Sequence, residues 1–185
     1  MTAGSRLFVI TGGPGSGKTT LCEALVEHDI MAVAESGRAV IRDQQEIAGS
    51  ALPWIDPQLF AAAILKQDLD QYQWALDNNQ TCLFDRGFPD NAGYLTMLGF
   101  DLPIVLESAC RNHRYAQPVF VAPPWQDIFC QDSERRQDWD EAVRTHKAVT
   151  ASYKRFGYDL ITLPLASVAE RVRFVLGYLL RDQPK

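Results

Sequence analysis

The sequence predicts a three-layer α/β/α fold built on a five-stranded parallel sheet. Two observations lead to this prediction. Five short apolar runs alternate along the chain with longer segments of helical periodicity, and a glycine-rich turn joins the first run to the first helical segment. Short buried strands that alternate with helices form right-handed crossovers, so we expect parallel strands covered by helices on both faces.

The first strand, helix and second strand follow from apolar spacing. Residues 7–11 form a short apolar run that ends in glycines, which predicts a buried strand. Residues 19–28 then have helical spacing. The positions that carry this spacing are Leu21, Ala24, Leu25 and His28. Residues 30–34 read as a second buried strand that ends at Glu35-Ser36-Gly37, and a helix is expected over 38–48.

A proline-containing loop separates these elements from a long helix at 58–78. The apolar face expected for this helix consists of Leu59, Ala62, Ala63, Leu69, Tyr72 and Leu76. A third strand is expected at 81–84, and it closes on Asp85-Arg86-Gly87. Two further strands are expected at 118–122 and 158–163. The last helix, 167–180, should pack on the sheet through one apolar stripe. That stripe consists of Val168, Val172, Val175, Leu176 and Leu179.

Length and charge limit the classes of protein. A chain of 185 residues with 46% hydrophobic residues predicts one domain, 1–185. The net charge of −5 and the pI near 5.2 give no overall electrostatic attraction to nucleic acid or to an anionic membrane surface, so we expect neither as a partner. The four cysteines and three histidines are scattered, so we expect reduced thiols and no Cys/His metal cluster. With no long apolar stretch and no leader-like start, the expected location is the cytoplasm, away from membranes.

The turn after the first strand matches the phosphate-binding pattern G-x-x-x-x-G-K-[ST] at residues 12–19. Backbone N–H groups can surround phosphate oxygens only where glycines admit positive φ and leave room, and the helix that follows adds its positive end. The expected nucleotide-binding residues are Gly12, Gly13, Pro14, Gly15, Ser16, Gly17, Lys18, Thr19 and Thr20. The alternative, a plain glycine-rich turn, matches this pattern by chance about once in a hundred chains of this length.

Asp85 ends the third predicted strand and is the expected acidic partner of the glycine turn. Mg²⁺ prefers oxygen ligands, and the Thr19 hydroxyl and the Asp85 carboxylate can supply them. The alternative is that Asp85 is a turn residue. Because ligands of parallel sheets bind at the carboxyl ends of strands, the turn, the segment 35–38 and Asp85-Arg86 should converge on one cleft. ATP and Mg²⁺ are the cofactors that this cleft predicts.

The chain resembles the small-molecule kinase branch of P-loop proteins, among them predicted AAA-type ATP-binding proteins distantly similar to nicotinamide riboside kinases and deoxynucleoside kinases. The resemblance covers nearly the whole chain. The residues that carry it are TGGPGSGKTT at 11–20, Glu35, FDRG at 84–87, Arg135 and Arg136. It implies the strand order 2-3-1-4-5, an acid that activates an acceptor hydroxyl, and an arginine-bearing lid around 126–140.

The resemblance and the needs of phosphoryl transfer together give each polar residue an expected role. Catalysis requires cations around the transferred group and a carboxylate that accepts a proton. The catalytic candidates are Lys18, Glu35, Asp85, Arg86, Arg135 and Arg136, and the substrate-binding candidates are Glu35, Arg38 and Arg86. Which of Glu35 and Asp85 is the base stays open, and a Glu35–Arg38 salt bridge or solvated charges at 135–136 are the alternatives.

The aromatic residues and missing motifs narrow the function further. Trp54 and Trp125 lie in loops, where stacking on a ligand and capping the core are both open and capping is favoured, while Trp74 and Trp139 are expected to pack within helices. No guanine-reading motif follows the fourth strand, which favours ATP. We therefore expect an ATP-dependent kinase of a small hydroxyl- or phosphate-bearing metabolite, nucleoside-like in the first instance. The alternatives are an ATPase or nucleotide switch acting on a protein partner, and a nucleic-acid-handling factor. The acceptor and the oligomeric state stay open.

Overall fold

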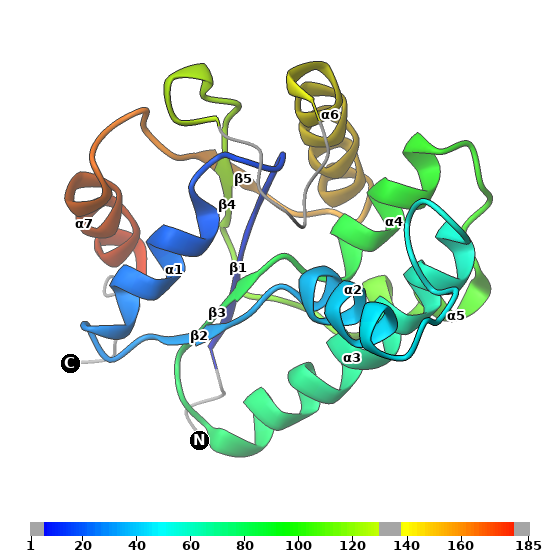
Figure 1. Cartoon of the computed structure of the whole chain (residues 1–185). Helices are drawn as coiled ribbons and strands as arrows, with labels where there is room; N and C mark the ends of the chain where they lie inside the picture. Colours follow the sequence, from blue (N-terminus) through cyan, green and yellow to red (C-terminus); the bar gives the residue numbers. More distant parts are fainter. Residues whose placement is uncertain (1–5, 130–137, 180–185) are drawn as a thin grey trace.

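The computed structural model describes residues 6–129 and 138–179, and its centre is a five-stranded sheet with the order β2-β3-β1-β4-β5 (Figure 1). The strands are β1 (Leu7–Gly12), β2 (Met31–Val33), β3 (Cys82–Asp85), β4 (Val119–Ala122) and β5 (Leu160–Thr162). Every pairing between neighbours is parallel. The predicted α/β fold class and strand order 2-3-1-4-5 are therefore confirmed.

Helices cover both faces of this sheet (Figure 1). One face carries α1 (Lys18–Val26) and α7 (Val168–Leu179). The helices on the opposite side are α2 (Ser36–Glu46), α3 (Pro57–Asn78), α4 (Phe88–Met97), α5 (Ile104–Asn112) and α6 (Trp139–Arg155). A short 3-10 turn, η1 (Gln126–Ile128), follows β4. Within the described residues, no helix is both long and apolar enough to cross a membrane.

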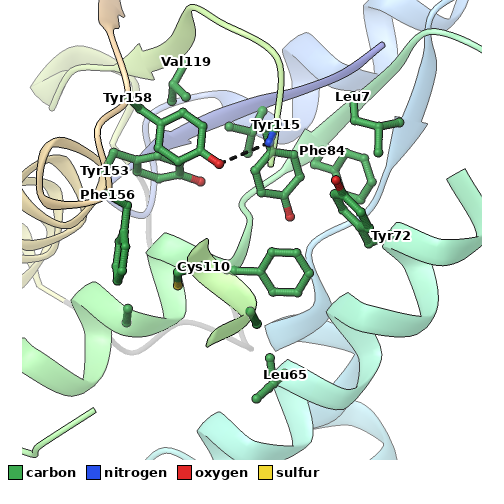
Figure 2. Close-up of a cluster of buried hydrophobic side chains, with 14 of the residues drawn as sticks. Leu7, Leu65, Tyr72, Phe84, Cys110, Tyr115, Val119, Tyr153, Phe156 and Tyr158 are labelled. Carbon is green, nitrogen blue, oxygen red and sulfur yellow. Dashed lines mark hydrogen bonds between the residues drawn. The ribbon is translucent and has the colours of Figure 1, made fainter. Parts of the chain in front are cut away.

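The alternation of side chains along β1 divides the core in two. Phe8 and Ile10 face α1 and α7, while Leu7 and Val9 belong to the larger cluster beneath α3 to α6. Figure 2 shows part of that larger cluster, in which the rings of Tyr72 and Tyr115 meet edge to face with centroids 5.6 Å apart. The turn at the carboxyl end of β1 is therefore anchored by a strand that is buried on both faces.

The sequence analysis assigned no helix to residues 88–112, where the structure has α4 and α5. Helix α4 is buried on nearly all sides, so it has no polar stripe that would reveal its period. Gly93 explains how closely it packs, since a Cβ there would lie 2.9 Å from the Val149 Cα of α6. A helix enclosed in this way cannot be recognised from amphipathic spacing.

The predicted faces of two helices need correction. Leu59 and Leu76 of α3 are 46% and 39% exposed, and the residues that α3 buries are Phe60, Ala61, Leu65, Tyr72 and Ala75. Trp74, expected in the core, is 46% exposed. His28 lies beyond the end of α1 and is exposed. The apolar content of α3 exceeds what one face can bury, so composition could not select the buried stripe.

Among the described residues, Cys22, Cys82 and Cys110 are free and buried. Burial raises the pKa of all three thiols, so each packs as an inert small apolar group. No group of three or more potential metal-binding His, Cys, Asp or Glu side chains occurs in this described part of the chain. Cys130 lies outside it.

Candidate functional site

The glycine-rich turn between β1 and α1 has backbone angles that favour glycine. The φ angles are 137° at Gly12, 70° at Gly15 and 76° at Gly17, which is the N-cap of α1. A Cβ on Gly12 would collide with the carbonyl oxygen of Ala122 in β4, and one on Gly13 would collide with that of Ala142 in α6. The turn is therefore shaped by its own conformation and also by two elements that press against it.

Lys18 lies at the centre of this turn. Its side chain is 2% exposed, and Nζ donates to the Gly13 carbonyl oxygen at 2.7 Å and to Ser16 Oγ at 3.4 Å. An ammonium group held by the turn's own oxygens is a cation already placed inside the phosphate-binding loop. Thr20 is exposed at the start of α1, beside a cavity that the turn lines.

Thr19, in the first turn of α1, is hydrogen-bonded to Asp85 at the end of β3. The Thr19 hydroxyl donates to Asp85 Oδ2 at 2.7 Å, while Asp85 Oδ1 is buried and has no hydrogen-bond partner among the described residues. Burial is the largest influence on this carboxyl group and raises its pKa, against the lowering effect of Lys18. A buried carboxylate oxygen without a donor, beside a hydroxyl, matches the oxygen ligands that Mg²⁺ prefers.

Arg86 connects the turn to two acids. It follows β3 with a positive φ of 78°, and its Nε donates to Glu35 Oε1 at 2.9 Å. Its NH1 donates to the Gly12 carbonyl oxygen and to Asp90 Oδ1, each at 3.0 Å. Burial alone would lower the pKa of Arg86, but Glu35 and Asp90 outweigh it and raise the pKa overall. The guanidinium is therefore a permanent cation that fixes Glu35 beside the turn.

Asp90, which the sequence analysis did not select, is a hub of this network. It is 5% exposed and accepts hydrogen bonds from the Thr11 hydroxyl at 2.6 Å and the Tyr153 hydroxyl at 2.7 Å. It also accepts one from the Gly87 backbone N–H at 3.0 Å. The signal that could have located it is the spacing Arg86-x-x-x-Asp90 at a helix start, where an acid caps the helix and faces the arginine.

Two cavities border these residues. One, of about 410 Å³, is lined by residues 15–20 of the turn together with Trp125 and Arg171. The other, of about 350 Å³, lies between α2, α3, α4 and α6 and is lined by Glu35 and Arg86 among others. After the roles proposed for them below, we call the first the nucleotide cavity and the second the acceptor cavity. Arg38 lines both, and its Nε lies 3.6 Å from Glu35 Oε2, so the salt bridge that the sequence offered as the alternative to a functional role is present.

Arg171 of α7 is a second residue that the sequence analysis missed. It is 2% exposed, and its NH1 and Nε donate to the carbonyl oxygens of Ser16 and Pro164, each at 2.9 Å. Its guanidinium lies 5.2 Å from the ring centroid of Trp125. Its NH2 has no hydrogen-bond partner among the described residues. Arg171 thus braces the turn from α7, which lies on the same face of the sheet as α1.

The described residues include both loop tryptophans and only part of the segment expected to form a lid. Trp54 is 50% exposed and lines the acceptor cavity, so it does not cap the core as expected, while Trp125 lies under Arg171 in the nucleotide cavity. Phe129 lies in the segment expected to form a lid, fills the space that a Cβ on Gly15 would need, and meets the ring of Trp139 with centroids 5.5 Å apart. Arg135 and Arg136 lie outside the described residues.

The comparisons with known proteins agree with this architecture. The Ehrlichia chaffeensis thymidylate kinase structure superposes with a TM-score of 0.67 at 15% identity, covering 95% of this chain and 99% of that one. The M. mycoides deoxyadenosine kinase with dCMP and dCDP gives a TM-score of 0.65 at 12% identity, covering 94% and 98%. The NadR protein in complex with NR gives 0.69 at 15% identity, covering 98% of this chain and 52% of that one.

At these identities the structural neighbours establish the fold, and this chain spans about half of the NadR chain. None of the curated proteins matches the sequence significantly. A family model described as an AAA domain matches residues 7–171, which include the glycine turn, Glu35, Asp85 and Arg171. The match extends over most of the chain, and the protein therefore belongs to the AAA domain family and has a P-loop kinase-like fold.

Proposed function

We propose that this protein is an ATP-dependent kinase that transfers the γ-phosphoryl group of ATP to a hydroxyl group of a small metabolite. One observation carries the proposal. Arg86 bonds simultaneously to the Gly12 carbonyl of the phosphate-binding turn and to Glu35 at the wall of the acceptor cavity. A carboxylate is thereby held where the end of a bound triphosphate would meet a bound acceptor.

The comparisons support this proposal through fold. Two of the structural neighbours are named as kinases, one of thymidylate and one of deoxyadenosine. Their identities of 15% and 12% leave the activity of this chain a proposal. The site supplies the independent support, because a protein that only hydrolyses ATP has no need of a second cavity beside the carboxylate.

The turn would bind the triphosphate through its backbone N–H groups and through Lys18, which can leave the Gly13 carbonyl for a phosphate oxygen. Thr19 and Asp85 would hold Mg²⁺, with the unpartnered Asp85 Oδ1 as the available oxygen. When bound, the metal would neutralise charge on the phosphate oxygens. Arg38, which borders both cavities, is placed to approach the transferred group.

The reaction needs one proton acceptor. As the acceptor oxygen forms a bond to the γ-phosphorus, the bond from that phosphorus to the β–γ bridging oxygen breaks, and ADP leaves with the electron pair. Glu35 takes the proton that the acceptor hydroxyl loses. The ion pair with Arg86 would hold Glu35 oriented before the substrate arrives. We assign the base to Glu35 because Asp85 Oδ2 already accepts the Thr19 hydroxyl.

The test measures phosphorylation and nucleotide binding in parallel. With ATP, Mg²⁺ and a panel of hydroxyl-bearing metabolites, the parent protein should form a phosphorylated acceptor detected by mass spectrometry. Glu35→Gln should lower this rate by about 100-fold or more while ATP binding, measured by calorimetry, is retained. Glu46→Gln, at the exposed end of the same helix, is the matched control and should be as active as the parent.

Two results would contradict the proposal. If ATP were only hydrolysed slowly and no member of the panel became phosphorylated, an ATPase or a nucleotide switch acting on a protein partner would be favoured. If Glu35→Gln transferred phosphate at the parental rate, the proton acceptor would lie elsewhere.

A further inference from the structure

The charges that line the acceptor cavity are mainly negative. Four carboxylates line it, from Glu35, Asp68, Asp90 and Glu141, and two guanidinium groups, from Arg38 and Arg86. Arg86 is already committed to Glu35 and Asp90. Arg38 lies next to Glu35 and also faces the nucleotide cavity. Within the described residues, a phosphate group on the acceptor would therefore meet more carboxylates than cations.

Asp68 is a carboxylate of this cavity that the proposed chemistry does not use. The Ser36 hydroxyl donates to its Oδ1 at 2.5 Å, and among the described residues Asp68 has no cationic partner. Ser36 directly follows Glu35, so Asp68 lies close to the proposed base. Its second oxygen is available to a hydrogen-bond donor on a ligand that already reaches Glu35.

Asn91 adds a second acceptor in the same wall. It is 4% exposed, and its Nδ2 donates to the Ala61 carbonyl oxygen at 2.8 Å, which fixes the orientation of the amide. Its Oδ1 has no hydrogen-bond partner within the described ranges. Buried polar atoms are rarely left unpaired, so this oxygen also indicates a ligand that donates hydrogen bonds.

The remaining wall is apolar and aromatic. Phe60 and Tyr94 meet edge to face with ring centroids 5.9 Å apart, and Trp54 and Leu98, 50% and 43% exposed, also line the cavity. A volume of about 350 Å³ is at the small end of ligand pockets, which span about 300–1,000 Å³. This part of the cavity suits a planar ring or a compact apolar group.

We infer that the acceptor is an unphosphorylated hydroxyl compound, neutral or cationic, that offers a second hydrogen-bond donor to Asp68 and a ring to the aromatic wall. This inference rests on the proposed kinase function and selects between the two acceptor classes that the sequence left open. The reacting hydroxyl binds at Glu35, the second donor at Asp68, and the ring against Phe60. Compounds that already carry a phosphate are excluded by the carboxylates.

The affinity should depend on pH through Asp68. Burial raises the pKa of Asp68 to about 7, the Ser36 hydrogen bond opposes this rise, and Asp90 and Glu35 add to it. The titratable and charged groups that face Asp68 from the surrounding elements are Glu35, Arg38, Arg86, Asp90, Cys110 and Tyr115. Since the ionised form accepts a donor better, affinity should rise by up to about tenfold between pH 6 and pH 8.

The experiment compares matched pairs of probes by calorimetry, with Mg²⁺ and a nonhydrolysable ATP analogue present. The pairs are adenosine and AMP, cytidine and CMP, and thymidine and TMP. At least one nucleoside should bind tenfold or more tightly than its monophosphate. Asp68→Asn should weaken that binding about tenfold at pH 8 and remove the rise with pH, whereas Asp70→Asn, on the exposed side of the same helix, should do neither.

The outcomes separate this inference from the kinase proposal. A monophosphate that binds better than its nucleoside, or the absence of binding by every probe, would overturn the inference. Transfer of phosphate to monophosphates alone would also overturn the inference, and it would leave ATP-dependent phosphoryl transfer standing while calling for a new test of the hydroxyl acceptor. Nucleosides that bind in an Asp68-dependent manner without being phosphorylated would support the inference and overturn the kinase proposal.

Discussion

Replacing Asp68 by Asn should stabilise the protein, and the gain should grow with pH. The folded pKa of about 7 is raised from 3.8, so the parent binds an extra proton in the folded state between these values. The protonated Asp68 carboxyl group makes its full contribution to stability below about pH 4, and this contribution is lost as the pH rises toward 7. A difference of about 3 pKa units corresponds to at most about 4 kcal/mol. Because Asp68 is only partly buried, we expect about 1–2 kcal/mol.

The assay is urea unfolding at pH 4.5 and pH 8, followed by circular dichroism. Asp68→Asn keeps an oxygen for the Ser36 hydroxyl, so the change removes mainly the buried charge. Asp70→Asn is the control, since it breaks only an exposed pair with Lys66 and should cost about 0.3–0.5 kcal/mol. If Asp68→Asn gave the same change in the free energy of unfolding at both pH values, Asp68 would not carry a raised pKa and the electrostatic reasoning would be wrong.

Three other substitutions test the glycine-rich turn and the residue that braces it. Lys18→Ala should weaken ATP binding at least tenfold in calorimetry, because it removes the cation held in the turn, and parental affinity would show that the site is misplaced. Gly13→Ala should lower the free energy of unfolding by about 1–3 kcal/mol through its clash with Ala142, whereas Gly177→Ala, with open space around it, should not destabilise. Arg171→Ala should weaken ATP binding severalfold, because it removes the hydrogen bond to the Ser16 carbonyl that holds the turn. If the exposed control Arg173→Ala lost as much ATP affinity, Arg171 would have no special role in the turn.

The glycine turn illustrates what could be predicted. Its pattern, its position between a strand and a helix, and the partnership of Thr19 with Asp85 were all expected from the sequence and are present in the structure. The close placement of Glu35, Arg38 and Arg86 was also expected. These features could be predicted because they lie at or just after the carboxyl ends of strands, and in a parallel sheet the carboxyl ends of neighbouring strands meet at one edge.

Other features could not be predicted from spacing. Asp90 and Arg171 were missed because their importance comes from partners 63 to 155 residues away, Tyr153 and Ser16 respectively. Helix α4 was missed because burial on nearly all sides removes the polar stripe. For the half-exposed Trp54, capping of the core was favoured over stacking on a ligand, because an aromatic residue in a loop gives no sign of whether a cavity lies beneath it.

The sequence by itself determined the phosphate-binding turn and the order of elements that places polar residues at one end of the sheet. Those properties are local, since they depend on backbone preferences and on the spacing of neighbouring residues. Only the tertiary structure decided which carboxylates line the acceptor cavity, and it alone raised the pKa of Asp68 to about 7. How deeply a side chain is buried, and which charges surround it, depend on residues that come together only after the chain has folded.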